Sequence, residues 1–258
     1  MAVVGLNLEP VDQQHFALFN LGFRPFFLGA GLFGAVAMVI WLLNYSHHLP
    51  LNLLAMPSWQ WHAHEMIYGY TMAVVAGFLL TAVKNWTGVQ TIRGPLLALF
   101  VALWFLARLV MLLSDITPWI WLMAIQLLFL FGLVAAVAWP VVKVRQWSQL
   151  SIVLKLLLIG VSELLFWLGI AGVVADGEIW GLYSALYLIL SLLLLMLRRV
   201  GPFFIERGLD NGFKPKNYRT VDIGSMVAML LLRVTCCVLF QFIVIQLGVN
   251  ISNSGAAP

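Results

Sequence analysis

Charged residues are scarce in this chain of 258 residues, in which Asp, Glu, Lys and Arg together make up 9%. A soluble domain carries about a quarter charged residues, so the composition excludes a water-soluble globule. Intrinsic disorder is excluded as well, because 63% of the residues are apolar. Fourteen Lys and Arg against ten acids leave a net charge of +4. This positive field is too weak to predict nucleic-acid binding through a basic face.

Cysteine is also rare, and the two cysteines, Cys236 and Cys237, are adjacent in an apolar run. They imply no disulfide framework. The segment Met1–Phe23 holds two acids and no Lys or Arg, so it does not match a signal peptide. Phosphate loops, serine triads and dinucleotide fingerprints do not appear either. What remains is a polytopic membrane protein.

Apolar runs near 20 residues, the length that crosses roughly 30 Å of hydrocarbon, occur about seven times. Barrel strands would alternate polar and apolar residues, which these runs do not, so the predicted fold is an all-α transmembrane helix bundle. The predicted spans are Phe26–Leu43, Ile67–Val83, Pro95–Leu113, Trp119–Val142, Leu150–Val174, Trp180–Leu197 and Ile223–Leu247.

Basic residues mark alternate loops, which predicts the orientation. The loops after the first, third and fifth predicted spans contain no Lys or Arg and carry His47, His48, Asp115, Asp176 and Glu178 instead. Basic loops stay in the cytoplasm, so the amino terminus is predicted to be cytoplasmic. The basic residues are Arg24, Lys84, Arg93, Lys143, Arg145, Arg198, Arg199, Arg207, Lys214, Lys216 and Arg219.

The predicted organisation has five parts. A cytoplasmic segment, 1–24, precedes a six-helix transmembrane bundle, 25–197, and a basic cytoplasmic linker follows at 198–222. A seventh transmembrane helix, 223–247, and a tail, 248–258, complete the chain.

Ionisable residues inside the predicted spans cost about 2.5–3.5 kcal/mol each on insertion scales, so they usually have a partner or a function. Depth along the spans places His62, His64 and Glu65 of the second span near the outer face, with Arg108 in the outer half of the third span and Glu163 near the middle of the fifth or slightly outside it. Four of the six candidates thus lie at similar depth on three helices, which predicts a polar cluster in the outer half of the bundle. A structural Glu163–Arg108 pair that only fixes helix packing is the alternative. The candidates are His62, His64, Glu65, Arg108, Glu163 and Arg233.

The motif Trp61–Glu65 carries most of the chemistry. If it is helical, His62 and His64 lie ~200° apart and cannot bind one ion together; His64 then shares a face with Tyr68. An extended segment would point both imidazoles the same way and permit a shared metal, with Glu65 orienting a ring. In the helical case His62 lies on a face of small residues that admits either a packed helix or a flat ligand such as a porphyrin. That face comprises Glu65, Gly69, Ala73, Ala76 and Gly77.

Four motifs together resemble the NnrS family of bacterial inner-membrane proteins. The resemblance covers about Phe16 to Gly208, and its motifs stand in the family's order and spacing. They are Gly22–Phe27 (GFRPFF), Trp61–Met66 (WHAHEM), Leu80–Gly88 (LTAVKNWTG) and Arg198–Gly208 (RRVGPFFIERG). Arg108 stands in the third predicted span, between the third and fourth motifs.

The resemblance implies a haem- and copper-containing protein of nitric oxide metabolism or nitrosative-stress resistance in the bacterial inner membrane. It makes His62 and His64 the expected metal ligands and Arg108 the partner of a haem propionate or of Glu163. Glu65, Tyr68 and Glu163 are expected to support the ligands or the fold.

The chain departs from the family pattern in two respects. Family members have about twice as many spans as this length allows, so we expect a truncated member, a separately encoded second half or a homo-oligomer. Gly201 also stands where a larger apolar residue is expected.

Three functional hypotheses follow. The first is a haem and copper protein of nitric oxide metabolism. The second is a small-solute transporter or channel in which Arg108 and Glu163 line a polar path. The third is a cofactor-free membrane subunit or assembly factor. The sequence assigns no reaction to any of them.

Overall fold

The computed structural model describes residues 17–46, 56–114, 116–208 and 224. Within these ranges it contains six helices long and apolar enough to cross a membrane and no strand. The predicted all-α polytopic fold is confirmed. The predicted seventh span 223–247, the tail, Arg233 and the His47–His48 pair lie outside the described residues.

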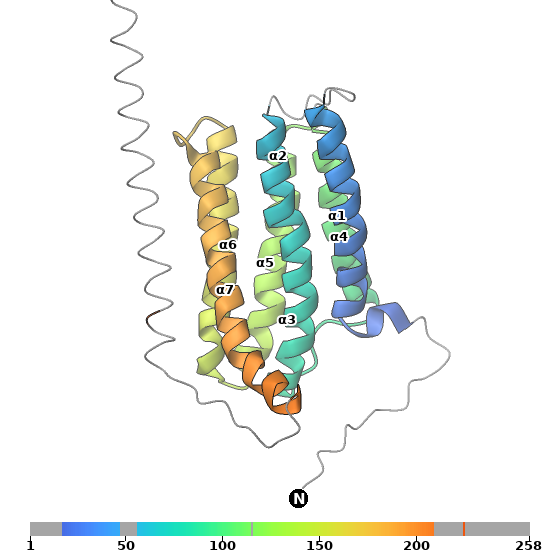
Figure 1. Ribbon diagram of the computed structural model, residues 1–258, viewed down its shortest axis with the longest axis vertical. Helices are drawn as coiled ribbons and strands as arrows, with labels where there is room; N and C mark the ends of the chain where they lie inside the picture. The colour runs from blue at the N-terminus through green and yellow to red at the C-terminus, as the bar shows by residue number, and fades with distance from the viewer. Residues whose placement is uncertain (1–16, 47–55, 115, 209–223, 225–258) are drawn as a thin grey trace, which may run out of the picture.

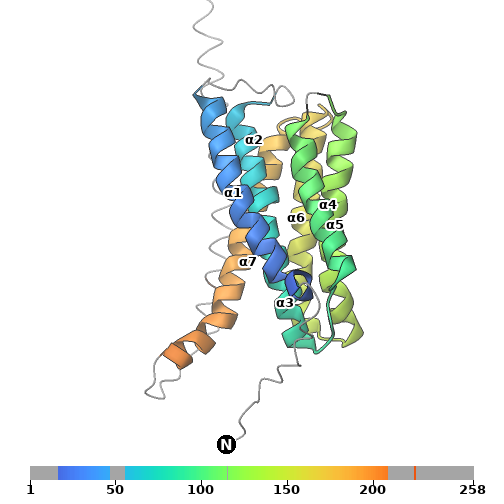
Figure 2. The same ribbon diagram turned by 90° about the vertical axis from the view of Figure 1, so that its right-hand side faces the viewer.

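The helices run alternately up and down the bundle (Figures 1 and 2). Their bounds agree with the predicted spans to within a few residues, except that the second span is longer at its start and the last helix is longer at its end. The bounds are α1 Phe23–Tyr45, α2 Ser58–His64, a π-helical segment Glu65–Thr71, α3 Met72–Thr87, α4 Pro95–Leu112, α5 Trp119–Lys143, α6 Leu150–Ile170 and α7 Gly177–Gly208.

The second span is a single membrane-crossing unit, Ser58–Thr87, made of α2, the π-helical segment and α3. Its 30 residues extend the predicted Ile67–Val83 by nine residues at the start. The histidine motif therefore lies inside a helix, with His64 about two turns from the start of that helix, rather than in a loop before it. The helical alternative of the sequence analysis is the correct one.

Glycine and proline set the ends of two helices at the basic end of the bundle. α3 stops at Gly88, whose φ of 69° is left-handed and whose N–H bonds the carbonyl of Lys84. α4 starts at Pro95, directly after Gly94 with φ 59°. A proline fits the first turn of a helix because the N–H that it lacks has no helical partner there.

The interior of the bundle is built on large aromatic side chains. Phe26, Trp104 and Phe129 are fully buried, and the Phe26 ring lies 6.3 Å and 6.2 Å from those of Trp104 and Phe129. The α2–α3 span contacts α1 on one side and α5 on the other, while α7 packs along α6. Leucines such as Leu32 on α1 are exposed, as expected for side chains that face lipid.

Three of the four family motifs meet at the basic end. The backbone N–H of Phe23 donates to the Thr81 hydroxyl at 3.1 Å, which joins the first motif to the third. Arg199 lies 4.0 Å from the centre of the Trp86 ring, in a cation–π contact, and also donates to Gln149. α7 thus continues through the Arg198–Gly208 motif, which the sequence analysis assigned to a linker, and links it to α3.

The cytoplasmic position of this end is a prediction that labelling can check. In a background with Cys236 and Cys237 replaced by serine, Asn85→Cys at the basic end should react with an impermeant thiol reagent only in inside-out vesicles. Asp176→Cys, in the α6–α7 turn at the opposite end (Figure 1), should react in intact cells. The reverse pattern would invert the predicted topology.

Candidate functional site

Around the π-helical segment Glu65–Thr71, the buried side chains of the second span form two rows, here called stripes, that face different helices. A π-helix closes i→i+5 bonds and is wider than an α-helix, so side chains four apart nearly align. His64, Tyr68 and Met72 form one buried stripe, and Glu65 and Gly69 belong to the other. Ring contacts place the first stripe against α6, while the second meets Arg108 and Trp104 of α4.

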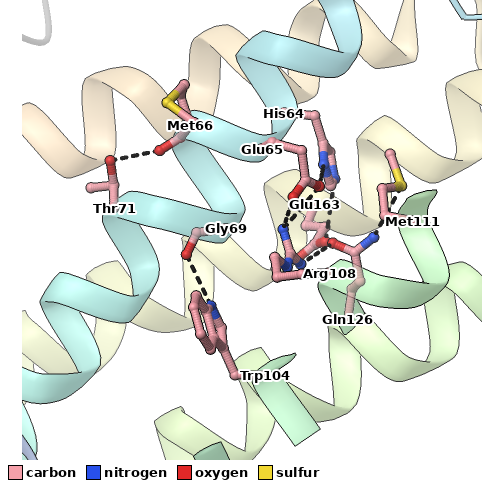
Figure 3. Close-up of polar contacts among 10 residues, drawn as sticks. All are labelled: His64, Glu65, Met66, Gly69, Thr71, Trp104, Arg108, Met111, Gln126 and Glu163. Atoms are coloured by element: carbon pink, nitrogen blue, oxygen red, sulfur yellow. Dashed lines mark hydrogen bonds and ion pairs between the residues drawn. The ribbon is translucent and has the colours of Figure 1, made fainter. Parts of the chain in front are cut away.

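An ion pair between Glu65 and Arg108 is the centre of the second stripe (Figure 3). Nη1 of Arg108 donates to both carboxylate oxygens of Glu65, each at 2.9 Å. Nη2 donates to Oε1 of Gln126 on α5 at 2.8 Å, and the Gln126 amide lies 3.7 Å from the sulfur of Met111. Arg108 therefore joins three helical spans at the level of the histidine motif.

His64 is fully buried, and its two ring nitrogens have different surroundings. Nδ1 lies 3.1 Å from Oε1 of Glu65, so an N–H on Nδ1 donates to the carboxylate. That tautomer leaves a lone pair on Nε2. Nε2 has no hydrogen-bond partner among the described residues and lies 3.6 Å from Oε1 of Glu163.

Glu163 on α6 is 1% exposed, and neither of its carboxylate oxygens has a hydrogen-bond partner in the described part of the chain. With neutral His64 and both carboxylates ionised, the cluster holds one guanidinium against two carboxylates, a net charge of −1 in a medium where charge is costly. In that state a lone pair on Nε2 would face the Glu163 carboxylate across the 3.6 Å separation. A proton on Nε2 or a metal ion between His64 and Glu163 would supply the balancing positive charge.

Aromatic rings enclose this pair. The centres of the Phe166 and Tyr68 rings lie 4.6 Å and 5.0 Å from that of His64, and the Trp167 ring meets it edge-on at 5.9 Å. The Tyr68 hydroxyl donates to the carbonyl of Gly181 on α7 at 3.0 Å. Tyr68 thus anchors the second span to α7 and closes one side of the site.

The structure brings four of the candidate residues together, His64, Glu65, Arg108 and Glu163, and places His62 outside this cluster. The His62 ring stacks on Trp41 of α1 with a centre-to-centre distance of 4.4 Å and is only partly buried. His62 and His64 point to different neighbours, so the two rings do not share an ion. The alternative pair Glu163–Arg108 does not form in the described part of the chain, where Arg108 pairs with Glu65 instead.

The face of small residues is occupied by packed side chains. A Cβ added to Gly77 would lie 2.9 Å from the Phe27 ring and 3.0 Å from Cβ of Phe26. One added to Gly69 would lie 2.5 Å from Nη1 of Arg108. The sequence analysis left two occupants open for this face of small residues, a packed helix or a flat ligand. Side chains of neighbouring helices fill the face, so a flat ligand does not fit there.

Sequence reasoning missed three residues that shape the site, Gln126, Gly177 and Gly181. Gln126 is a neutral polar residue in an apolar span, so charge alone does not single it out. A further buried cation, Lys155, is 9% exposed and lies on α6 eight residues before Glu163, about 12 Å along the helix axis. Gly177 and Gly181 form a small-xxx-small motif that brings α7 against α6, a signal that was readable in the sequence.

The surroundings of His64 limit the groups that it could hold. A haem bound by His64 would need the space that Glu163 fills, 3.6 Å from Nε2. Aromatic rings also cover the ring of His64. A single ion between Nε2 and the carboxylate needs no such space. The described residues contain no group of three or more His, Cys, Asp or Glu placed to hold an ion.

The fold and site define a multi-pass helical membrane protein with a buried charged cluster between its second, third and fifth spans. Family comparison then gives the particular family. The model described as "NnrS protein" matches residues 17–253, which is most of the chain, and the chain belongs to the NnrS family. No curated protein and no solved structure matches it.

Proposed function

We propose that this chain is a membrane protein of nitric oxide metabolism or nitrosative-stress resistance whose working centre is one metal ion held by His64 and Glu163. Family membership supports the biological role. The observation that carries the site is Nε2 of His64 facing the Glu163 carboxylate at 3.6 Å, with no hydrogen-bond partner for either group among the described residues.

The separation of the two donor atoms supports this assignment. Metal bonds to imidazole nitrogen and carboxylate oxygen measure ~2.0–2.2 Å. Two such ligands at tetrahedral to trigonal angles around one ion stand about 3.4–3.6 Å apart. The observed 3.6 Å between Nε2 and Oε1 matches that spacing.

The residues around the pair have the roles expected in a metal site. Glu65 accepts from Nδ1 of His64 and so orients the ring with Nε2 toward the ion. Arg108 neutralises Glu65 and holds its carboxylate in place. Phe166, Tyr68 and Trp167 exclude bulk water.

We propose copper as the metal, on the resemblance, because imidazole and carboxylate both bind it. Two protein ligands leave coordination positions open, as catalytic sites do, and the bound ion would supply Lewis acidity or one-electron chemistry to a small molecule such as nitric oxide. The resemblance also implies haem, which we do not assign to His64. The haem content of the same purified protein tests whether haem is present.

Metal and haem content of the purified protein test the proposal. We expect about one copper ion per chain after reconstitution of wild type, loss of that copper in His64→Ala and Glu163→Gln, and retention in His62→Ala. Loss of one of only two protein ligands should weaken binding by at least the 10–100-fold that second-shell changes cost. A Soret band in the same sample would report haem.

Helical content and elution volume of each variant serve as the folding control. In cells, His64→Ala should abolish protection against nitric oxide while His62→Ala keeps it. A wild-type protein that takes up no transition metal on reconstitution would contradict the proposed site. A His62→Ala, His64→Ala double variant that still protects cells would favour the cofactor-free subunit or assembly factor.

A further inference from the structure

A pocket of about 420 Å³ opens at the end of the bundle opposite the basic loops, between the start of α2 and the α6–α7 turn. This is the predicted outer side. The α6–α7 turn and the first turn of α2 lie at the same end in Figure 1. The pocket is lined by Met56, Pro57, Trp59, Gln60, Gly169, Ile170, Glu178 and Ile179.

Some of the residues that line this pocket lie on the same two helices as His64 and Glu163, nearer to the end of the bundle. Gln60, which lines the pocket, and His64 are both buried on α2 and are four residues apart, a rise of about 6 Å. On α6, Gly169 lies six residues beyond Glu163, a rise of about 9 Å. Pocket and pair are therefore separated by about one to two helical turns on the same two helices.

Phe166 occupies the interval. It lies one turn below Gly169 and Ile170 and one turn above Glu163 on the buried face of α6, and its ring centre is 4.6 Å from that of His64. The barrier between pocket and site is thus an aromatic side chain, which would have to change rotamer to open a path.

The chemistry of the lining favours a cation. Glu178 is the one charged residue among the lining residues, and Gln60 adds an amide and Met56 a thioether. No described Lys, Arg or His lines the pocket. An ion with about six waters occupies on the order of 200 Å³, since each water takes about 30 Å³. A hydrated metal ion therefore fits within the pocket.

We propose that this pocket is the access vestibule through which a hydrated metal cation reaches His64 and Glu163 from the outer side, with Phe166 as the gate. This inference rests on the proposed function, because it needs a metal site below the pocket. Glu178 draws the cation into the pocket by its charge, without being a permanent ligand.

The rate of copper uptake tests the proposal, measured in detergent at low salt by transfer from a chromophoric chelator. Glu178→Gln should slow uptake on the order of tenfold, because electrostatic steering into clefts changes association rates by at least that much. It should also flatten the salt dependence of the rate. Ile170→Trp should slow uptake by filling the pocket. The affinity for copper at equilibrium should stay unchanged in both variants.

Asp176→Asn is the matched control. It removes one negative charge two residues from Glu178, at an exposed turn position with φ 55° that does not line the pocket, and asparagine accepts that backbone conformation. Its uptake rate should stay near wild type. If wild type binds copper at equilibrium but Glu178→Gln and Ile170→Trp load as fast as wild type, the vestibule is wrong and the metal site stands. If wild type binds no copper at any time point, both proposals fail.

Discussion

Replacing Arg108 by alanine is expected to leave little folded protein in detergent, the largest loss of any single change at the cluster. Both carboxylate oxygens of Glu65 accept a charge-assisted hydrogen bond from Nη1 of Arg108, and Glu65 is 1% exposed. Removing one partner of a buried ion pair costs about 3–5 kcal/mol, because the other charge stays buried and unpaired. That is a large part of the roughly 5–15 kcal/mol that holds a typical protein folded.

Thermal unfolding followed by circular dichroism measures this effect, with Arg93→Ala as control. Arg93 is exposed in the loop before α4, where such changes stay within about ±0.5 kcal/mol. The double variant Glu65→Gln, Arg108→Met removes both charges, and should recover part of the loss since neither partner is left charged and alone. An Arg108→Ala protein as stable as Arg93→Ala would show that the pair contributes nothing.

Gly181→Val is expected to separate α7 from α6. A Cβ at Gly181 would lie 2.6 Å from the carbonyl oxygen of Ser162 and 2.7 Å from the backbone nitrogen of Phe166. These are backbone atoms and cannot rotate away, so the helix itself must shift. Overpacking of this kind costs about 1–3 kcal/mol and occasionally more. The Gly181 carbonyl that accepts from Tyr68 would move as well.

Gly31→Val is the matched control, because nothing lies within 4 Å of the Cβ position of Gly31 on α1. Valine there gains a few tenths of a kcal/mol of helix propensity over glycine. The melting temperature of Gly181→Val should be below that of wild type, and that of Gly31→Val should be equal to or slightly above it. Equal melting temperatures would mean that the α6–α7 contact is not set by Gly181.

Helix lengths and the height of each charge could be predicted from the sequence, because span length and hydropathy follow from the thickness of the bilayer. Height alone put His62, His64, Glu65, Arg108 and Glu163 in the outer part of the bundle, and it did not separate His62 from the other four. It could not say which carboxylate Arg108 would choose, since that depends on how each helix is rotated about its axis. In the structure Arg108 pairs with Glu65, and Glu163 lies beside His64.

The histidine motif shows the same limit. An ideal α-helix correctly separates His62 from His64, but nothing in Glu65–Thr71 announces a π-helix. Its wider turn decides which side chains meet α6 and which meet α4. Gln126 was missed because a neutral amide at the middle of an apolar helix becomes significant only once its partner, Arg108, is placed.

The Glu65–Thr71 segment also separates the two halves of the second span. Each turn there holds about one residue more than an ordinary helical turn, and one residue corresponds to about 100° of rotation around the axis. The Thr71 hydroxyl caps the carbonyl of Met66 at 2.7 Å, which satisfies an acceptor inside the segment. The extra rotation therefore sets the direction of the His64 ring separately from that of α3, whose Gly77 packs against Phe26 and Phe27 of α1.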